Sequence, residues 1–150
     1  MWRRKKDYDS QSRIATRTDA KNQRAEYIYD AYNRLTMVKR YPVAGGSEAT
    51  AQRTTFECDL GTGRNLWGRL ARIVYGSGYV ERFSYTASGL VAQKTQVPAP
   101  MLSPSLSLDY TWDNEGQVTS LTYPETGVPR PGAGYDAVPR RVVSYGRDAA

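Results

Sequence analysis

Short runs of apolar and aromatic residues alternate with polar turn residues along most of this chain. Three of these runs, at residues 35–41, 70–75 and 118–123, follow a segment with Gly or Asn and end on a tyrosine. β-Branched and aromatic runs separated by turn signals every 20 to 30 residues are typical of short strands and argue against helices. The pattern therefore predicts an all-β fold, in which consecutive β-hairpins form a twisted antiparallel ribbon.

One seven-residue pattern recurs six times in degenerate form: an aromatic residue, Asp, two variable residues, a small residue, Arg and an aliphatic residue. It is clearest in residues 8–14 and 29–35, and the six copies begin near residues 8, 29, 58, 85, 112 and 135. The residues that carry this signature are Tyr8, Asp9, Arg13, Tyr27, Tyr29, Asp30, Arg34, Leu35, Asp59, Gly68, Arg69, Leu70, Tyr85, Gly89, Tyr110, Trp112, Asp113, Gly116, Tyr135, Asp136 and Arg140.

The middle of each copy has the chemistry of a tight turn. Asp starts turns because its carboxylate accepts hydrogen bonds from backbone N–H groups just ahead of it. The small position needs a positive φ, which Gly and Asn adopt readily and Ser12 fits less well. The sixth copy has Pro139 in this region, and because proline cannot adopt a positive φ, that turn must differ or fail.

Side chains two apart share one face of a strand, so three aromatic pairs are expected on one face. These pairs are Tyr27/Tyr29, Phe83/Tyr85 and Tyr110/Trp112. After three of the turns the aliphatic residues lie three apart: Leu35 and Val38, Leu70 and Ile73, and Val118 and Leu121. A regular strand would put them on opposite faces. Either the first aliphatic residue belongs to the turn, or a β-bulge follows it.

Three copies place Asp four residues before Arg: Asp9/Arg13, Asp30/Arg34 and Asp136/Arg140. We expect these pairs to bracket hairpin turns, where each Arg reaches its Asp or a turn carbonyl. An exposed pair of this kind contributes only about 0–1 kcal/mol, so the spacing indicates an architectural use.

The composition makes tyrosine the main apolar material. Leu, Ile, Val and Phe account for only 25 of the 150 residues, whereas there are twelve Tyr and three Trp. Buried tyrosine hydroxyls need hydrogen-bond partners. The chain is therefore expected to form a thin wall with one wet side instead of an oily core.

Several kinds of catalytic and metal-binding chemistry need residues that this chain does not have. There is no histidine, which removes the histidine triads and imidazole zinc sites, and the single Cys58 cannot form an intrachain disulfide. The carboxylates of Asp113 and Glu115 are better explained by a turn, and residues 61–64 lack the ending of a phosphate loop. We therefore expect no enzyme activity, no cofactor and no metal. No stretch is long and apolar enough to span a membrane.

The net charge of +6 lies entirely in residues 1–40, since the rest of the chain is balanced. A basic chain rich in tyrosine offers an alternative function, in which Tyr and Arg/Lys bind a polyanion. The candidate partners are an acidic glycan or single-stranded nucleic acid, of which nucleic acid is the less favoured. Solvation of a frayed, charged end explains the basic run at residues 3–6 more simply.

Domain organisation follows from these patterns. Residues 1–7 are expected to be a basic disordered tail, residues 8–145 to hold about six repeats, and residues 146–150 to be a second tail. Prolines indicate loops at residues 97–104 and 124–134.

The pattern resembles the YD or RHS repeat, a family that includes bacterial Rhs proteins, wall-associated proteins, the cocoon components of Tc toxins and the teneurins. The best matches are residues 8–14, 29–35 and 68–70, and the resemblance covers roughly residues 8 to 145. It implies a β-ribbon that spirals into a shell, which encloses a toxin or supports cell-surface interaction.

The resemblance does not carry every family property to this chain. The bacterial members have a cleavage motif that begins with Asp-Pro, and this chain has no Asp-Pro dipeptide. Self-cleavage and toxicity are therefore not expected. We expect a shell fragment whose partners are the remainder of a larger shell or further copies of itself. The family suggests an extracellular or cell-envelope location, although no signal peptide is seen in the sequence.

Overall fold

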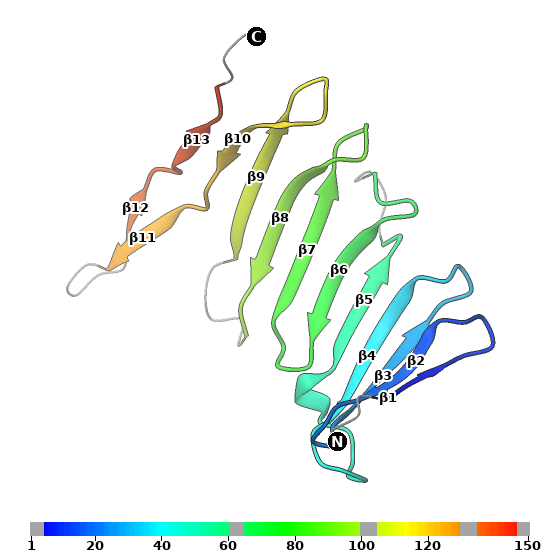
Figure 1. The fold of residues 1–150 in the computed structure, drawn as a ribbon. Coiled ribbons are helices and arrows are strands. Elements are labelled where there is room, and N and C mark those ends of the chain that lie inside the picture. The colour runs from blue at the N-terminus through cyan, green and yellow to red at the C-terminus, as the bar shows by residue number, and fades with distance from the viewer. Residues whose placement is uncertain (1–4, 61–64, 100–104, 130–134, 147–150) are drawn as a thin grey trace.

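The computed structural model describes residues 5–60, 65–99, 105–129 and 135–146, and this part of the chain is all-β (Figure 1). One sheet contains eleven strands, and β11 and β12 form a separate two-stranded sheet. The strands are β1 (Lys5–Tyr8), β2 (Ile14–Thr18), β3 (Arg24–Tyr29), β4 (Leu35–Tyr41), β5 (Thr54–Cys58), β6 (Leu70–Tyr75), β7 (Val80–Tyr85), β8 (Val91–Val97), β9 (Leu106–Trp112), β10 (Val118–Thr122), β11 (Thr126–Pro129), β12 (Tyr135–Val138) and β13 (Val142–Ser144). A single 3₁₀ turn, η1 (Thr50–Gln52), interrupts this series within the described residues.

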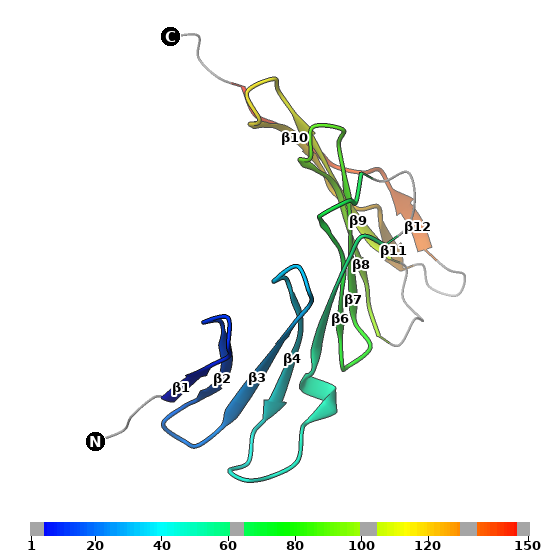
Figure 2. The same ribbon diagram turned by 90° about the vertical axis from the view of Figure 1, so that its right-hand side faces the viewer.

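The large sheet follows chain order from β1 to β10, and β13 then adds beside β10. Every neighbouring pair is antiparallel, so the chain runs back and forth as successive hairpins. The sheet is open and strongly twisted: Figure 2 shows β1–β4 turned away from the plane of β6–β10. The predicted fold class, an all-β ribbon of consecutive hairpins, is confirmed.

A β-bulge follows the turn in each of the first five repeats. Tyr8 pairs with Ile14 but Asp7 pairs with Thr16, which leaves Ala15 as an extra residue. The same slip recurs in the other four hairpins, where the extra residues are Thr36, Ala71, Ala92 and Thr119. Because of this extra residue, the side chains that follow the first aliphatic residue point to the opposite face from the one that regular alternation would give. Of the two explanations that the sequence left open, the structure shows the bulge, and it accounts for the spacing of three between aliphatic residues.

The sheet is a thin wall. Among the described residues only Val38, Leu66, Ala71 and Val97 are buried apolar residues, and no side chain is completely enclosed. Most strand residues are half-buried on both faces. With so little fully buried apolar area, the fold must depend on cross-strand contacts and on hydrogen bonds more than a two-layer domain does. None of the described helical segments is long and apolar enough to cross a membrane.

Three segments differ from the sequence expectations. Residues 5–7 belong to β1, where a disordered tail was predicted, because Thr16 of β2 donates a 2.9 Å hydrogen bond to Asp7 and the backbones pair. Residues 126–129 of the predicted Pro-rich loop form β11. Val97, assigned to the other loop, is the buried last residue of β8. Residues 1–4, 100–104, 130–134 and 147–150 lie outside the described part of the chain.

The sixth repeat does not form the expected hairpin. Tyr135 and Asp136 lie in β12, which pairs with β11 instead of with the strand that follows it. The chain then continues through Pro139 to β13, which pairs with β10. Proline cannot supply the left-handed turn residue that the other copies use, and this explains why the chain does not fold back at once.

Candidate functional site

The repeat turns lie together along one edge of the sheet, which we call the turn edge. Its described residues are 9–13, 30–34, 59–60, 65–69, 86–90 and 113–117. These turns share an edge because an antiparallel meander returns to the same side after every second strand (Figure 1).

The first two turns have the same internal geometry. The Oδ1 atom of Asp9 accepts from the N–H groups of Gln11 and Arg13, each at 2.9 Å, and the N–H of Asp9 bonds to the carbonyl of Arg13. Asp30 does the same with Tyr32 at 2.8 Å and Arg34 at 2.9 Å. The last loop residue is in the left-handed region, so Asp and the closing Arg bracket a three-residue loop.

Positive φ angles occur where the sequence predicts them. The small position of the five turns has φ values of 61° at Ser12, 64° at Asn33, 71° at Gly68, 90° at Gly89 and 77° at Gly116. Ser12 adopts this conformation although serine does so less readily than glycine or asparagine. The hydrogen bonds of Asp9 hold the turn around it.

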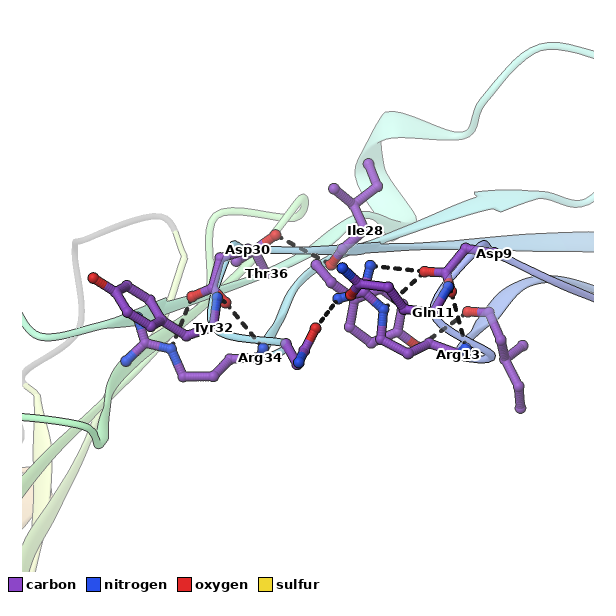
Figure 3. Close-up of polar contacts among 11 residues, drawn as sticks. Asp9, Gln11, Arg13, Ile28, Asp30, Tyr32, Arg34 and Thr36 are labelled. Atoms are coloured by element: carbon purple, nitrogen blue, oxygen red, sulfur yellow. Dashed lines mark hydrogen bonds and ion pairs between the residues drawn. The ribbon is translucent and has the colours of Figure 1, made fainter.

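Each Asp in the first two turns also pairs with the Arg that closes its turn (Figure 3). The Nε atoms of Arg13 and Arg34 donate to Oδ2 of Asp9 and Asp30, each at 2.8 Å. The backbone N–H of the closing Arg, followed by its side chain, holds the pKa of each carboxyl below its usual value. Local charge and backbone geometry thus support the same turn.

The closing Arg also reaches the next turn along the edge. Arg13 Nη1 donates to Oδ1 of Asn33 at 2.7 Å, and Arg34 Nη1 donates to Oδ2 of Asp59 at 2.6 Å. Asp30 and Asp59 together raise the pKa of the Arg34 guanidinium. Consecutive repeats are therefore connected by side chains as well as by the backbone.

In two repeats the closing Arg also covers the leading aromatic ring of the next repeat. The guanidinium carbon of Arg13 lies 4.4 Å from the ring centre of Tyr29, and that of Arg69 lies 5.6 Å from the ring centre of Tyr85. The second repeat differs because the next leading residue is Cys58, and Arg34 instead lies 5.2 Å from Tyr32 in its own turn. These are cation–π distances, each contributing roughly 0.5–1 kcal/mol when exposed.

The leading aromatic of a repeat donates a hydrogen bond back to the preceding hairpin. Tyr29 Oη donates to the carbonyl of Ile14 at 3.0 Å, Tyr85 Oη to that of Leu70 at 2.8 Å, and Trp112 Nε1 to that of Val91 at 2.7 Å. In each case the acceptor is the first aliphatic residue after the preceding turn. Backbone pairing between neighbouring hairpins has ended there, for example at Thr16 between β2 and β3. The aromatic side chain bridges this unpaired stretch.

Cys58 is the exception in this series and gives a test. It holds the leading position of the third repeat but has no hydroxyl or indole N–H to reach the carbonyl of Leu35, and burial raises its pKa. We predict that Cys58→Tyr raises the free energy of unfolding by about 1 kcal/mol, because a new hydrogen bond and ring contact form. Urea denaturation measures it, with Cys58→Ser as the control. A destabilised tyrosine variant would show that the position has no room for the ring.

The third and fourth turns keep the geometry with different residues. Asp59 accepts from the N–H of Gly68 at 2.6 Å across a longer loop, and Arg69 bonds to the carbonyl of Asn65. Thr86 replaces Asp in the fourth turn, and its hydroxyl accepts from the N–H of Leu90 at 3.1 Å. Gly89 leaves the space that Arg69 fills, since a Cβ there would lie 2.4 Å from Arg69 Nη2.

The remaining predicted residues belong to the fifth repeat, which forms the expected turn, and to the sixth, which does not. Tyr110 and Trp112 stack with ring centres 6.2 Å apart, and Asp113 accepts from the N–H groups of Glu115 and Gln117 in its turn. Arg140 does not close a turn: it forms an ion pair with Asp109 and donates to the carbonyl of Tyr123 at 2.9 Å. The side chains of Tyr135 and Asp136 lie outside the part that the structure describes.

Sequence reasoning missed a turn on the opposite edge that has the same Asp-centred hydrogen bonds. Asp19 accepts from the N–H groups of Lys21 at 2.8 Å and Gln23 at 2.9 Å, and Asn22 has a φ of 59°. The spacing of Asp to Asn matches that of Asp30 to Asn33 and could have revealed it. It was missed because Thr18, not an aromatic residue, precedes Asp19.

The Asp carboxylates make stability depend on pH. The pKa values of Asp9, Asp30 and Asp59 are lowered in the folded chain, by backbone N–H groups for the first two and by the Arg34 side chain for Asp59. Their contribution is therefore present above an unfolded pKa of about 4 and is lost as the pH falls through the folded values. We predict a urea midpoint that is constant from pH 7 to 5 and falls below about pH 4.

The matched variant is Asp30→Asn with Asp59→Asn, which retains oxygen acceptors but cannot titrate. Its midpoint should be lower than that of the parent at pH 7 and should fall less between pH 5 and pH 2.5. Parallel profiles for the two proteins would contradict the assignment of this pH dependence to these carboxylates.

Comparison with known proteins agrees with this architecture. No protein-family model matches the sequence, and no curated protein matches it significantly. Solved structures do share its fold. TcdB2-TccC3 without the hypervariable C-terminal region aligns with a TM-score of 0.68 and 18% identity, over 91% of this chain. TcdB2-TccC3 aligns with a TM-score of 0.67 and 20% identity over 82%. The Photorhabdus luminescens Tc holotoxin pore aligns with a TM-score of 0.61 and 18% identity over 82%.

These alignments establish a shared fold. The chain spans about 6% of the length of each TcdB2-TccC3 chain and 5% of the holotoxin chain. The likeness is thus to a short segment of much larger proteins.

Proposed function

We propose that this chain is a non-catalytic structural segment of the YD or RHS repeat type, which builds part of a larger shell. One observation carries the proposal: neighbouring repeats bond to one another through side chains. The closing Arg of the first two repeats bonds forward to the next turn, and the leading aromatic of the second, fourth and fifth repeats bonds back to the preceding hairpin. Such nearest-neighbour coupling is the basis of stability in repeat proteins. No catalytic group, metal or cofactor is assigned to the chain in this proposal.

The structural neighbours and the sequence pattern support the shell role together. The neighbours are TcdB2-TccC3 and the Photorhabdus luminescens Tc holotoxin pore, and the chain matches a small share of their length. The resemblance to YD repeats implies a wall that encloses a toxin or supports cell-surface interaction. We infer that the chain contributes its thin sheet to such a wall.

The two outermost strands of the sheet support association with further strands. β1 and β13 are the edge strands, and each has one side without a strand partner among the described residues. Tyr145 N–H bonds to the carbonyl of Thr119 in the direction of β10. Since N–H groups alternate along a strand, that of Ser144 points away from the sheet.

Sedimentation velocity over a concentration series tests the proposal. We expect the average mass to rise with concentration, and we expect Ser144→Pro to weaken this association because proline removes an outward N–H from the β13 edge. Ser144→Ala is the matched control and should associate like the parent. The proposal would be contradicted by a parent chain that stays monomeric at all concentrations and whose free energy of unfolding, measured by urea denaturation, is about 5–15 kcal/mol, as for a complete domain.

A further inference from the structure

Two aromatic side chains protrude from neighbouring turns of the turn edge. Tyr32 is 78% exposed and Trp67 is 87% exposed, whereas most aromatic side chains of the strands are half-buried. Each stands directly before the left-handed residue of its turn, Asn33 or Gly68. The two rings therefore occupy equivalent positions at the tips of the second and third turns. Neither ring belongs to the contacts that connect one repeat to the next.

The turn that presents Trp67 is fixed on both sides of this residue. Leu66 is buried, and its carbonyl accepts from the N–H of Arg69 at 2.9 Å. The N–H of Gly68 donates to Oδ1 of Asp59 at 2.6 Å. The exposure of the indole is therefore a property of an ordered turn. Because tryptophan is highly buried on average in folded proteins, this exposure indicates a surface that another molecule covers.

The two turns that carry these rings lie side by side. They are separated by two strand spacings, about 10 Å, and the 2.6 Å hydrogen bond from Arg34 to Asp59 joins them directly. Figure 3 shows the Tyr32 ring beside the Arg34 guanidinium, whose carbon lies 5.2 Å from the ring centre. Leu60 follows Asp59 and is 41% exposed. We call the three exposed apolar side chains of these adjacent turns, Tyr32, Leu60 and Trp67, the aromatic tip.

The charges around the aromatic tip are balanced. In the described residues of the first three turns, the three Asp residues equal the three closing Arg residues in number, and the first two turns hold theirs as ion pairs. A polyanion meets no excess of positive charge there. Zwitterionic phospholipid headgroups also carry paired opposite charges, and they therefore suit a balanced edge. Trp and Tyr concentrate at the boundary between lipid and water, because their rings are apolar while their N–H and O–H groups stay in contact with water.

We propose that the turn edge docks onto a membrane surface, with the aromatic tip entering the headgroup region of zwitterionic phospholipid. Rings this exposed suit a deformable headgroup layer better than a rigid protein partner, which would need a matching pocket for each ring. Three side chains bury little apolar area, so a single chain binds weakly and reversibly. The docking uses the turn edge and leaves β1 and β13 unoccupied, so it is tested separately from the shell role.

Vesicle flotation of the full chain tests the inference. The probes are phosphatidylcholine vesicles, which are zwitterionic, and vesicles that also contain phosphatidylserine, which are anionic. We expect the chain to float with phosphatidylcholine vesicles at low and high salt alike, since net charge does not drive the binding. Trp67→Ser with Tyr32→Ser should lower the partition coefficient about tenfold, because two rings no longer enter the interface.

Val43→Ser with Tyr123→Ser is the matched control. It removes two exposed apolar side chains from the opposite edge of the sheet and should change the partition coefficient less than about twofold. Circular dichroism checks that each variant retains its sheet. Equal losses in the two double variants would reduce the effect to general surface hydrophobicity and overturn the inference.

Quenching of tryptophan fluorescence by brominated phosphatidylcholine identifies the residue that enters the membrane. We expect strong quenching in the parent and little in Trp67→Phe, which should still float because phenylalanine retains an apolar ring. Quenching that persists in Trp67→Phe would assign the insertion to another tryptophan and overturn the inference. Absence of flotation with phosphatidylcholine, or flotation only with the anionic vesicles at low salt, would also overturn it. So would a Trp67→Ser, Tyr32→Ser variant that alters sedimentation but not flotation, since the turn edge would then pack against a second copy.

Discussion

Gly76→Ala is expected to destabilise the chain by about 3 kcal/mol, the largest effect of a single added methyl group among the glycines whose surroundings the structure describes. A Cβ on Gly76 would lie 1.8 Å from the carbonyl oxygen of Thr50 and 2.9 Å from two carbonyl carbons of η1. These atoms belong to the backbone and cannot rotate away. The N–H of Gly76 also donates to the carbonyl of Arg53 at 2.7 Å, so separating η1 from the turn breaks this bond. Overpacking costs about 1–3 kcal/mol, and the lost hydrogen bond adds about 1 kcal/mol.

Gly146→Ala is the matched control for this substitution. A Cβ on Gly146 meets no atom within 4 Å, and its backbone is not in the left-handed region. The added methyl group should change the free energy of unfolding by at most about 0.5 kcal/mol, or stabilise the chain slightly by restricting the unfolded state. Urea denaturation of both variants measures the difference. Equal stability of the two would mean that η1 does not pack against the β6–β7 turn.

The second large effect is expected at Tyr85, the leading aromatic of the fourth repeat. Tyr85→Ala should cost about 2–3 kcal/mol, because it removes a half-buried ring below Arg69 and the hydrogen bond to the carbonyl of Leu70. Tyr85→Phe keeps the ring and should cost about 1 kcal/mol. The difference separates ring packing from hydrogen bonding between hairpins.

Tyr8 provides the control for Tyr85 within the same repeat position. It leads the first repeat, but it lies on the edge strand β1, has no hairpin before it in the sheet, and is 59% exposed. Tyr8→Ala should therefore cost less than about 1 kcal/mol, and Tyr8→Phe should have no measurable effect. If both alanine variants cost the same, the contact with the preceding hairpin contributes nothing, and the coupling between repeats would have to be reconsidered.

Much of the local structure could be predicted from residues close together in the sequence. Asp30, Asn33 and Arg34 form their turn from contacts within five residues, and the left-handed φ of Asn33 follows from its side chain. The spacing between Leu70 and Ile73 indicated either a bulge or a first aliphatic residue that belongs to the turn, since a regular strand would put the two on opposite faces. The missing turn at Pro139 also follows from local chemistry, because proline fixes φ.

The contacts between repeats could not be predicted in the same way. The carbonyl of Ile14 receives Tyr29, and Asp59 receives Arg34, because neighbouring hairpins diverge at the turn edge. The direction and extent of that divergence depend on the twist of the whole sheet. The pairing of Arg140 with Asp109 has the same origin, since β13 adds beside β10 after a detour through β11 and β12.

The sequence by itself determined the repeating hairpin, its turn geometry and the role of tyrosine as the apolar material of a thin wall. These properties depend on the φ preferences and hydrogen-bonding groups of residues a few positions apart. Only the tertiary structure decided which Arg reaches which turn, why Gly76 must lack a side chain, and how the turns of Tyr32 and Trp67 come to lie side by side. Those relations join residues far apart in the chain, and strand register and sheet twist fix them together.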